Sequence, residues 1–262
     1  MQQIVVTTPY DPPPELIERS RKAAAELGGQ WVARRGMSLS KLESRYAPEH
    51  LVVVGQEGIQ WHTGGAGGKP FFFHPGLSVV RIKRMMDGQK DAMLAACRFE
   101  PGDAVLDCTA GLASDSIVFS YAGAGRSEVT ALESRFPLYY VVSAGLRSYT
   151  AELEPITEAM RRIRAVHADH LAYLAALPDR SADIVYFDPM FRDPVHASSG
   201  ISPLRALADE RTLSHEAVRE ACRVARKCVV LKELRDSGEF ERLGFSVDSR
   251  SQSKIAYGVI LT

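Results

Sequence analysis

An aspartate, a proline and an aromatic residue stand together in Asp188-Pro189-Met190-Phe191, directly after the apolar run 184–187. A short run of β-branched and aromatic residues is typical of a buried strand, and a proline just past it cannot continue the ladder. The segment therefore lies at the carboxyl end of a strand, where open α/β sheets bind their ligands. A carboxylate, a rigid bend and a ring at that place can hold a planar substrate that carries an amino group.

Acidic side chains also follow the strands expected earlier in the chain. A turn with one glycine, Gly111, lies between a strand at 104–107 and a helix, so backbone N–H groups and the positive helix end can face a ligand. Glu133 follows the next strand, about 20 residues beyond the turn, where an acid commonly binds ribose hydroxyls. Asp169 follows the third strand and either faces an adenine ring or caps the next helix.

The glycine turn differs from the GxGxxG pattern of dinucleotide sites, because Thr109 and Ala113 flank Gly111. These side chains leave a pyrophosphate less room for close contact with the backbone. A purely structural turn fits this segment as well as a cofactor loop does. The expected ligand is therefore one that needs acceptors and no phosphate-binding loop. Three acids at one sheet edge favour a nucleoside that carries a positive sulfonium over a dinucleotide.

The Asp188 segment suits methyl transfer to the exocyclic amine of a base. Such an amine is a weak nucleophile because its lone pair is delocalised into the ring, so orienting it is the main catalytic need. Asp188 and the Pro189 carbonyl can accept hydrogen bonds from the amine, and Phe191 can stack on the base, a contact worth about 1–3 kcal/mol. The alternative is a strand-ending turn whose phenylalanine packs in the core.

Strand and helix patterns alternate from Asp103 onward, which predicts crossover connections. Strands are expected at 104–107, 128–132, 163–167, 183–187 and 229–232, and helices at 113–121, 137–149, 169–177 and 214–225. Strands at 245–248 and 255–261 follow as an antiparallel hairpin. We therefore predict an α/β fold: a doubly wound, mostly parallel seven-stranded sheet with a C-terminal antiparallel hairpin.

The first 75 residues are less regular. A strand at 4–6, a helix at 14–27 and a hairpin of 51–54 with 58–61 predict a small α+β region, followed by helices at 76–86 and 89–97. We expect residues 1–75 to serve substrate recognition and 76–262 to form the catalytic domain. Basic residues near the junction can bind RNA, although a solvated helix face is an equal alternative. The substrate-binding candidates are Lys69, His74, Arg81 and, in a loop beside the site, Arg192.

Composition sets further bounds. The 262 residues include 32 basic and 32 acidic side chains, so the whole chain lacks the positive charge typical of nucleic-acid binding. The front of the chain has a small basic excess, which favours an anionic partner or reflects ordinary surface variation. The 4 cysteines form no CxxC pair, and the sequence shows neither a membrane-length apolar run nor a signal-peptide pattern, so we expect a cytoplasmic protein. His167 and His170 lack a third ligand, and no metal site is expected.

The turn 107–115, Glu133, the segment 167–170 and the run 185–191 resemble class I methyltransferases that use S-adenosyl-L-methionine. More narrowly, they are similar to the RsmJ-like group, which methylates the exocyclic N2 of a guanine in small-subunit ribosomal RNA. The resemblance covers about residues 100–235, and Asp-Pro-Met-Phe with its strand is its most specific part. It implies S-adenosyl-L-methionine as cofactor and RNA, ribosomal in this group, as partner.

The turn and the resemblance together define the expected site. The catalytic candidates are Asp188, Pro189 and Phe191. The cofactor-binding candidates are Asp107, Thr109, Gly111, Ser114, Asp115, Glu133, Ser134, Asp169, His170 and Asp188. Three positions depart from the family pattern, since Ala113 and Ser114 replace a glycine and an arginine, and Arg192 replaces a proline. A methyltransferase of small molecules or proteins, and a non-catalytic cofactor-binding module, are the alternatives.

Overall fold

The computed structural model describes residues 3–63, 69–189, 211–247 and 253–262. These residues divide into two compact units, each with its own sheet. Among them, the first unit comprises 3–63, 69–74 and 140–149, and the second comprises all the others. Helix α6 (Phe136–Ser148) therefore belongs to the second unit at its start and to the first unit over the rest of its length.

The second unit is built on a seven-stranded sheet of order β11-β12-β10-β9-β6-β7-β8. Its strands are β6 (Val105–Asp107), β7 (Val129–Glu133), β8 (Arg164–His167), β9 (Ala182–Phe187), β10 (Ala225–Leu234), β11 (Ser246–Val247) and β12 (Ile255–Leu261). Neighbours pair in parallel except β12, which runs antiparallel to both β10 and β11. The predicted fold class is confirmed, and the final strand proves to be an interior strand of the sheet.

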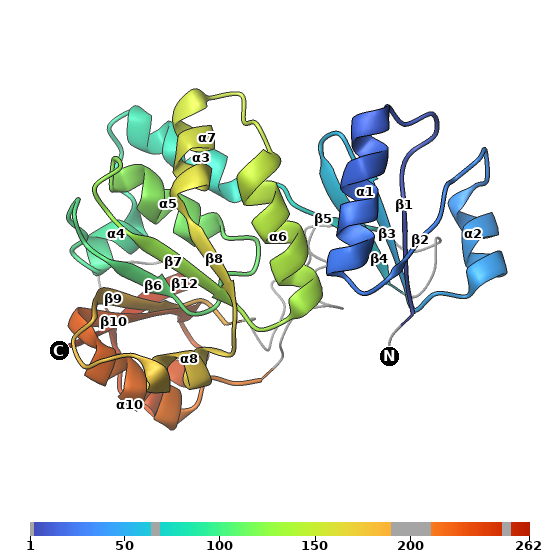
Figure 1. Cartoon of the computed structure of the whole chain (residues 1–262). Helices are drawn as coiled ribbons and strands as arrows, with labels where there is room; N and C mark the ends of the chain where they lie inside the picture. Colours follow the sequence, from blue (N-terminus) through green and yellow to red (C-terminus); the bar gives the residue numbers. More distant parts are fainter. Residues whose placement is uncertain (1–2, 64–68, 190–210, 248–252) are drawn as a thin grey trace. The chain divides into compact units, whose positions relative to one another are not determined.

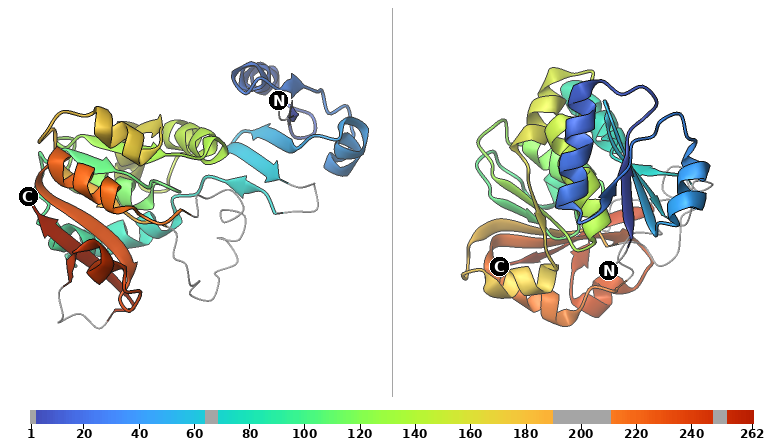
Figure 2. Two further views of the ribbon diagram at one scale, coloured as in Figure 1. Left: turned by 90° about the horizontal axis from the view of Figure 1, so that it is seen from below. Right: turned by 45° about the vertical axis from the view of Figure 1, so that its right-hand side comes forward.

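Helices cover both faces of this sheet (Figures 1 and 2). They are α3 (Gly76–Met86), α4 (Ala92–Ala96), α5 (Ser114–Ala122), α7 (Glu154–Arg162), α8 (His170–Ala176), α10 (His215–Val224) and α11 (Glu239–Leu243). Alternation along β9 sends Val185 and Phe187 into one core with α10, while Tyr186 packs on Phe119 of α5 with ring centroids 5.5 Å apart. Burial on both faces explains why the strand before Asp188 is apolar throughout.

The first unit has a five-stranded sheet of order β2-β1-β3-β4-β5. Its elements are β1 (Ile4–Thr7), α1 (Pro14–Glu26), β2 (Gln30–Trp31), α2 (Leu39–Tyr46), β3 (His50–Gly55), β4 (Gly58–Thr63) and β5 (Phe71–Phe72). The predicted α+β character and the β3–β4 hairpin are confirmed. The sequence did not reveal α2 or the two-residue strands, which are too short to show a period.

The register of the second sheet brings the ends of its central strands to one edge. Asp107 lies opposite Tyr186 across β6 and β9, and Phe187 lies opposite Leu231 across β9 and β10. The residues that follow these pairs therefore emerge side by side. This edge is where the sequence predicted the functional site.

Ala113 closes the turn between β6 and α5 in the left-handed conformation. Its φ is 58° and its ψ is 23°, and it is fully buried. This conformation costs a non-glycine residue about 1–2 kcal/mol. Burial of the methyl group, worth about 0.8 kcal/mol, offsets part of that cost. Alanine thus forms the turn that a glycine would form with less strain.

Ala113→Val is expected to lower the free energy of unfolding by about 2–4 kcal/mol, because a branched side chain must fit a buried left-handed position. The matched variant Ala113→Gly relieves the backbone strain but leaves a small cavity. We therefore expect its free energy of unfolding to change by less than about 1 kcal/mol. Urea denaturation followed by circular dichroism measures both. A valine variant as stable as the glycine variant would contradict a tight turn.

Candidate active site

Asp188 is fixed at the carboxyl end of β9 through both its backbone and its side chain. Its N–H donates to Thr109 Oγ1 at 2.5 Å, and its Oδ2 accepts a hydrogen bond from Lys232 Nζ at 2.7 Å. The side chain is 27% exposed. Lys232 bonds to Oδ2, and the partial exposure of the carboxylate lets it meet a ligand.

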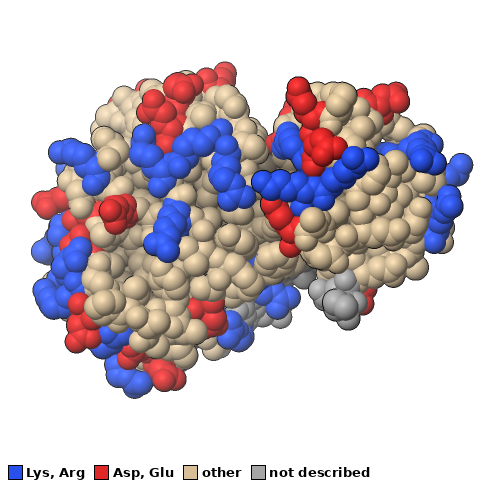
Figure 3. Space-filling model, in the orientation of Figure 1, with Lys and Arg blue, Asp and Glu red and all other residues tan. Residues whose placement is uncertain are grey.

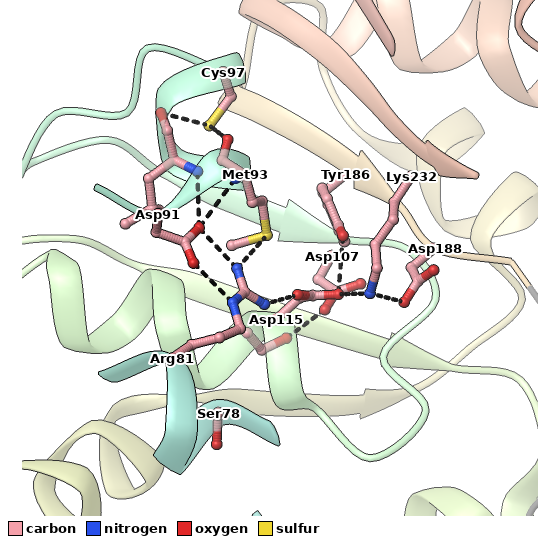
Figure 4. Close-up of polar contacts among 12 residues, drawn as sticks. Ser78, Arg81, Asp91, Met93, Cys97, Asp107, Asp115, Tyr186, Asp188 and Lys232 are labelled. Atoms are coloured by element: carbon pink, nitrogen blue, oxygen red, sulfur yellow. Dashed lines mark hydrogen bonds and ion pairs between the residues drawn. The ribbon is translucent and has the colours of Figure 1, made fainter. Parts of the chain in front are cut away.

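Asp115, on α5, is the centre of a group of buried charges beside Asp188 (Figure 4). Only 6% of it is exposed. Its carboxylate accepts hydrogen bonds from three donors: Lys232 Nζ at 3.0 Å, the Tyr186 hydroxyl at 2.9 Å and the Arg81 guanidinium. Three donors satisfy a carboxylate that would otherwise be costly to bury.

Arg81 joins helix α3 to this group. Its guanidinium donates two hydrogen bonds of 2.8 Å to Asp91, the residue that caps α4, and a third to Asp115. The sequence predicted Arg81 as a substrate ligand, whereas the structure places its charge between two carboxylates with the side chain 20% exposed. We call Arg81, Asp91, Asp115, Lys232 and Asp188 the charge chain.

Members of the charge chain control one another's protonation. Burial opposes the ionisation of Asp115, but Lys232 and Arg81 outweigh it and hold the pKa of Asp115 well below its ordinary value. Burial raises the pKa of Asp188; Lys232 opposes this rise and the charge of Asp115 adds to it. Burial also raises the pKa of the Tyr186 phenol far above its ordinary value, so Tyr186 is a neutral donor.

Asp107 and Thr109 stabilise the glycine turn through hydrogen bonds of their side chains. Asp107 is 1% exposed and accepts hydrogen bonds from the Ser116 hydroxyl at 2.5 Å and from the Thr109 N–H at 3.1 Å. Burial raises the pKa of Asp107 to about 7. Both were predicted to bind the cofactor, and in this structure their polar atoms join β6 to α5 and to β9.

Glu133 ends β7 and faces the turn. Its Oε2 accepts a hydrogen bond from the Gly111 N–H at 3.2 Å, and its Oε1 accepts one from the Arg135 N–H at 2.8 Å. Gly111 has a φ of +50°, and a Cβ built on it would meet no atom within 4 Å. Open space therefore adjoins the turn. Ser114, the first residue of α5, stands at the positive end of that helix.

Asp169 caps α8, one of the two roles that the sequence left open. Its Oδ1 accepts hydrogen bonds from the N–H groups of Leu171 and Ala172, and its Oδ2 accepts one from Arg211 at 2.7 Å. Partial burial opposes ionisation, but Arg211 and the helix N–H groups lower the pKa of Asp169. The Asp169 side chain is 34% exposed, so it remains accessible to a ligand while it caps the helix.

Ser134 and His170 flank these acids at the same edge of the sheet. The Ser134 carbonyl lies 3.1 Å from His167 Nε2. The His170 ring packs edge-on against Phe187 with centroids 5.7 Å apart. Both residues are half-buried.

The remaining predicted residues lie elsewhere. Lys69 and His74 are exposed side chains of the first unit. Pro189 ends a described range, and Phe191 and Arg192 lie outside the described residues. In the described ranges, no group of three His, Cys, Asp or Glu side chains could hold a metal ion. None of the helices in these ranges has the length and apolar character needed to cross a membrane.

Like Asp91, Lys232 is a member of the charge chain to which the sequence assigned no role. It lies on an interior strand at the edge where the acids gather, and its side chain is 17% exposed. A lysine in such a place needs an anionic partner, which is the signal that was available. Identifying Asp115 and Asp188 as those partners required the register of β9 with β10 and the position of α5.

A solved structure identifies the fold of this chain. The crystal structure of the SAM-dependent methyltransferase NGO1261 from Neisseria gonorrhoeae superimposes with a TM-score of 0.65 at 17% identity, over 99% of this chain and 96% of that one. The chain therefore has the fold of S-adenosylmethionine-dependent methyltransferases. Residues 72–250 match the family described as "Putative SAM-dependent methyltransferase", and the protein belongs to that family. The resemblance noted in the sequence is confirmed.

Sequence relatives include an uncharacterized protein and proteins named as ribosomal RNA methyltransferases. The uncharacterized protein YpiP of Bacillus subtilis is 40% identical over 258 residues, which is 98% of this chain and 99% of YpiP. Ribosomal RNA small subunit methyltransferase J of Acinetobacter baylyi is 29% identical over 70% of this chain and 67% of its own. The protein of the same name from Chromohalobacter salexigens is 30% identical over 66% of both chains.

Asp115→Asn is expected to lower the free energy of unfolding by about 3–5 kcal/mol, because it removes the anion between two buried cations. Urea denaturation near neutral pH measures this loss. The control Asp179→Asn breaks the pair with Arg223, in which the aspartate is 75% exposed, and should cost less than about 1 kcal/mol.

The destabilisation by Asp115→Asn should also depend on pH. Because the pKa of Asp115 is lowered in the folded state, its contribution is complete above the ordinary value of 3.8 and is lost as the pH falls further. The difference in stability between the two proteins should narrow below about pH 4. A difference that widened steadily with acid would contradict an ionised Asp115.

Proposed function

We propose that this protein transfers a methyl group from S-adenosylmethionine to an exocyclic base amine in RNA, with guanine N2 of small-subunit ribosomal RNA as the target. The observation that carries the proposal is the fixed, partly exposed carboxylate of Asp188. An acceptor held in this way orients a neutral amine, which is the main need of such a transfer. The similarity to two proteins named ribosomal RNA small subunit methyltransferase J supports a ribosomal substrate.

The residues at the ends of β6, β7 and β8 fit the cofactor. Space is open at Gly111, and the Glu133 carboxylate lies beside it, at the position where an acid commonly accepts hydrogen bonds from ribose hydroxyls. We assign the ribose to Glu133, the adenine to the Ser134–Asp169–His170 group and the methionine part to the Gly111 turn with Ser114. Asp107, Thr109 and Asp115 support this pocket through the hydrogen bonds that fix the turn and α5. When bound, the cofactor supplies a methyl group attached to a positive sulfur.

Asp188 performs the proton and positioning work. Its carboxylate accepts a hydrogen bond from the amine, and the Pro189 carbonyl is a second acceptor. Methylation leaves the nitrogen with one proton too many, and the ionised carboxylate takes it up. Phe191 stacks on the base and Arg192 binds the adjoining phosphate.

The first unit takes part in recognising the RNA, and its exposed Lys69 and His74 bind the substrate. Acidic and basic side chains are interspersed on the face shown in Figure 3, in keeping with equal totals of both. Affinity therefore depends on a few placed contacts more than on overall charge. The cysteines at 97, 108, 222 and 228 are free thiols, which fits a cytoplasmic enzyme.

The proposed reaction is tested with labelled S-adenosylmethionine and ribosomal subunits from a strain that lacks this protein. We expect label in small-subunit RNA and, after digestion to nucleosides, in N2-methylguanosine. Mass mapping of the same RNA from cells with and without the protein identifies the site. Transfer to proteins or small molecules, with none to RNA, would overturn the proposal.

Glu133→Ala is expected to weaken the binding of S-adenosylhomocysteine at least about 10-fold, because hydrogen bonds to a charged group contribute about 1.5–3 kcal/mol. Isothermal titration calorimetry measures the change. Glu128→Ala, an exposed position just before the same strand, is the control and should bind as the wild type does. Equal affinities of the two variants would remove Glu133 from the cofactor site.

Asp188→Asn is expected to slow methyl transfer at least about 100-fold, because an amide cannot take up the proton of the amine. Affinity for S-adenosylhomocysteine should stay within about 3-fold, equivalent to less than about 1 kcal/mol. Single-turnover assays and calorimetry separate the two effects. Asp236→Asn, at an exposed position, is the control. Full activity of Asp188→Asn would exclude the carboxylate from the chemistry.

A further inference from the structure

Lys232 connects the two carboxylates that matter most at this edge of the sheet. Its Nζ lies 2.7 Å from Asp188 Oδ2 and 3.0 Å from Asp115 Oδ2 (Figure 4). Parallel pairing of Leu231 with Phe187 puts the lysine next to Asp188 on the neighbouring strand. Two anions and a strand register thus hold one ammonium group in a defined place.

Three titratable groups act directly on this ammonium group: Asp115 of α5, Asp188 at the end of β9 and Tyr257 of β12. Asp107 of β6 and Tyr186 of β9 interact with Asp115 and Asp188, while Arg81 of α3 connects Asp115 to Asp91 before α4. Burial raises the pKa of Tyr257 to about 12, so this phenol is neutral, as is that of Tyr186. The groups that set the charge near Asp188 are therefore the carboxylates and the two cations.

The two cations divide the carboxylates between them. Arg81 donates to Asp91 and Asp115. Lys232 donates to Asp115 and Asp188. Within the described residues, Lys232 is the cation bonded to Asp188. Without it, Asp188 would face the negative charge of Asp115 with no compensating neighbour.

We propose that Lys232 is a positioning residue of the methyl transfer: its ammonium group favours the ionised form of Asp188 and holds one of the carboxylate oxygens, so that the other faces the target amine. This inference rests on the proposed function of Asp188. A protonated Asp188 could neither accept the amine hydrogen bond at that oxygen nor take up the proton. Lys232 therefore extends the range of pH in which the site works to lower values.

The first test measures the protonation of Asp188 directly, without substrate. In protein labelled with ¹³C at the aspartate carboxyl groups, the Asp188 signal is identified by its absence from Asp188→Asn. In Lys232→Met its titration midpoint is expected to rise by about 1–3 pH units, the effect of losing an opposite charge at contact distance. An unchanged midpoint would overturn the inference.

A matched control removes a lysine from the other end of the same strand. Lys227 pairs with Asp103 at 2.5 Å and with Glu100 at 3.3 Å. Lys227→Met should leave the Asp188 midpoint where it is in the wild type. Lys232→Arg keeps the charge and should return the midpoint close to the wild-type value. If Lys232→Met does not fold, Lys232→Gln takes its place, with urea denaturation as the check on folding.

The second test uses the reaction. The acid limb of the pH–rate profile for single-turnover methyl transfer should move upward in Lys232→Met by the same interval as the NMR midpoint. Activity should recover at high pH, which a merely structural defect would not allow. A limb that stays in place while the rate falls at every pH would overturn the inference. Absence of transfer by the wild type would instead overturn the proposed function, and the NMR titration would still decide the role of Lys232.

Discussion

The burial of Asp115 is the constraint on which the site depends. A carboxylate that is 6% exposed is tolerable only when its charge and lone pairs are satisfied, and Arg81, Lys232 and Tyr186 do this. The three donors come from α3, β10 and β9, so one side chain of α5 ties together elements from three parts of the sequence. Losing Arg81 or Lys232 would leave negative charge uncompensated beside Asp188, and losing the Tyr186 hydroxyl would leave a buried acceptor without its donor. The charges at this edge of the sheet and the positions of the three elements that carry them therefore depend on each other.

The site consists of two halves with different physical characters. On the side of β7 and β8, Glu133 and Asp169 are partly exposed acceptors fixed by backbone N–H groups. On the side of β9 and β10, the charge chain is held by ion pairs and is mostly buried, with Asp188 as its most exposed member. The hydrogen bond from the Asp188 N–H to Thr109 Oγ1 joins the halves across β6. A nucleoside and an amine can thus be held by separate groups on one rigid frame.

Local patterns in the sequence were sufficient for the sheet and for part of the site. The apolar run before Asp188 and the acid Glu133 could be placed at strand ends because periodicity and turn residues are local signals. Helix α7 was missed, although Ile156, Ala159 and Met160 lie on one buried face. The charge chain could not be predicted, because Arg81 and Lys232 lie 34 and 117 residues from Asp115. Such pairs follow from tertiary packing, which leaves no local trace in the sequence.

The place of β12 between β10 and β11 has a consequence for how the protein is made. Tyr257 lies opposite Lys232, yet it is synthesised after the whole of β10. In a nascent chain that ends at β11, the edge of β10 is unpaired, and Lys232 lacks its neighbour on β12. The pairing that completes this edge of the sheet therefore forms only after residues 255–261 have left the ribosome.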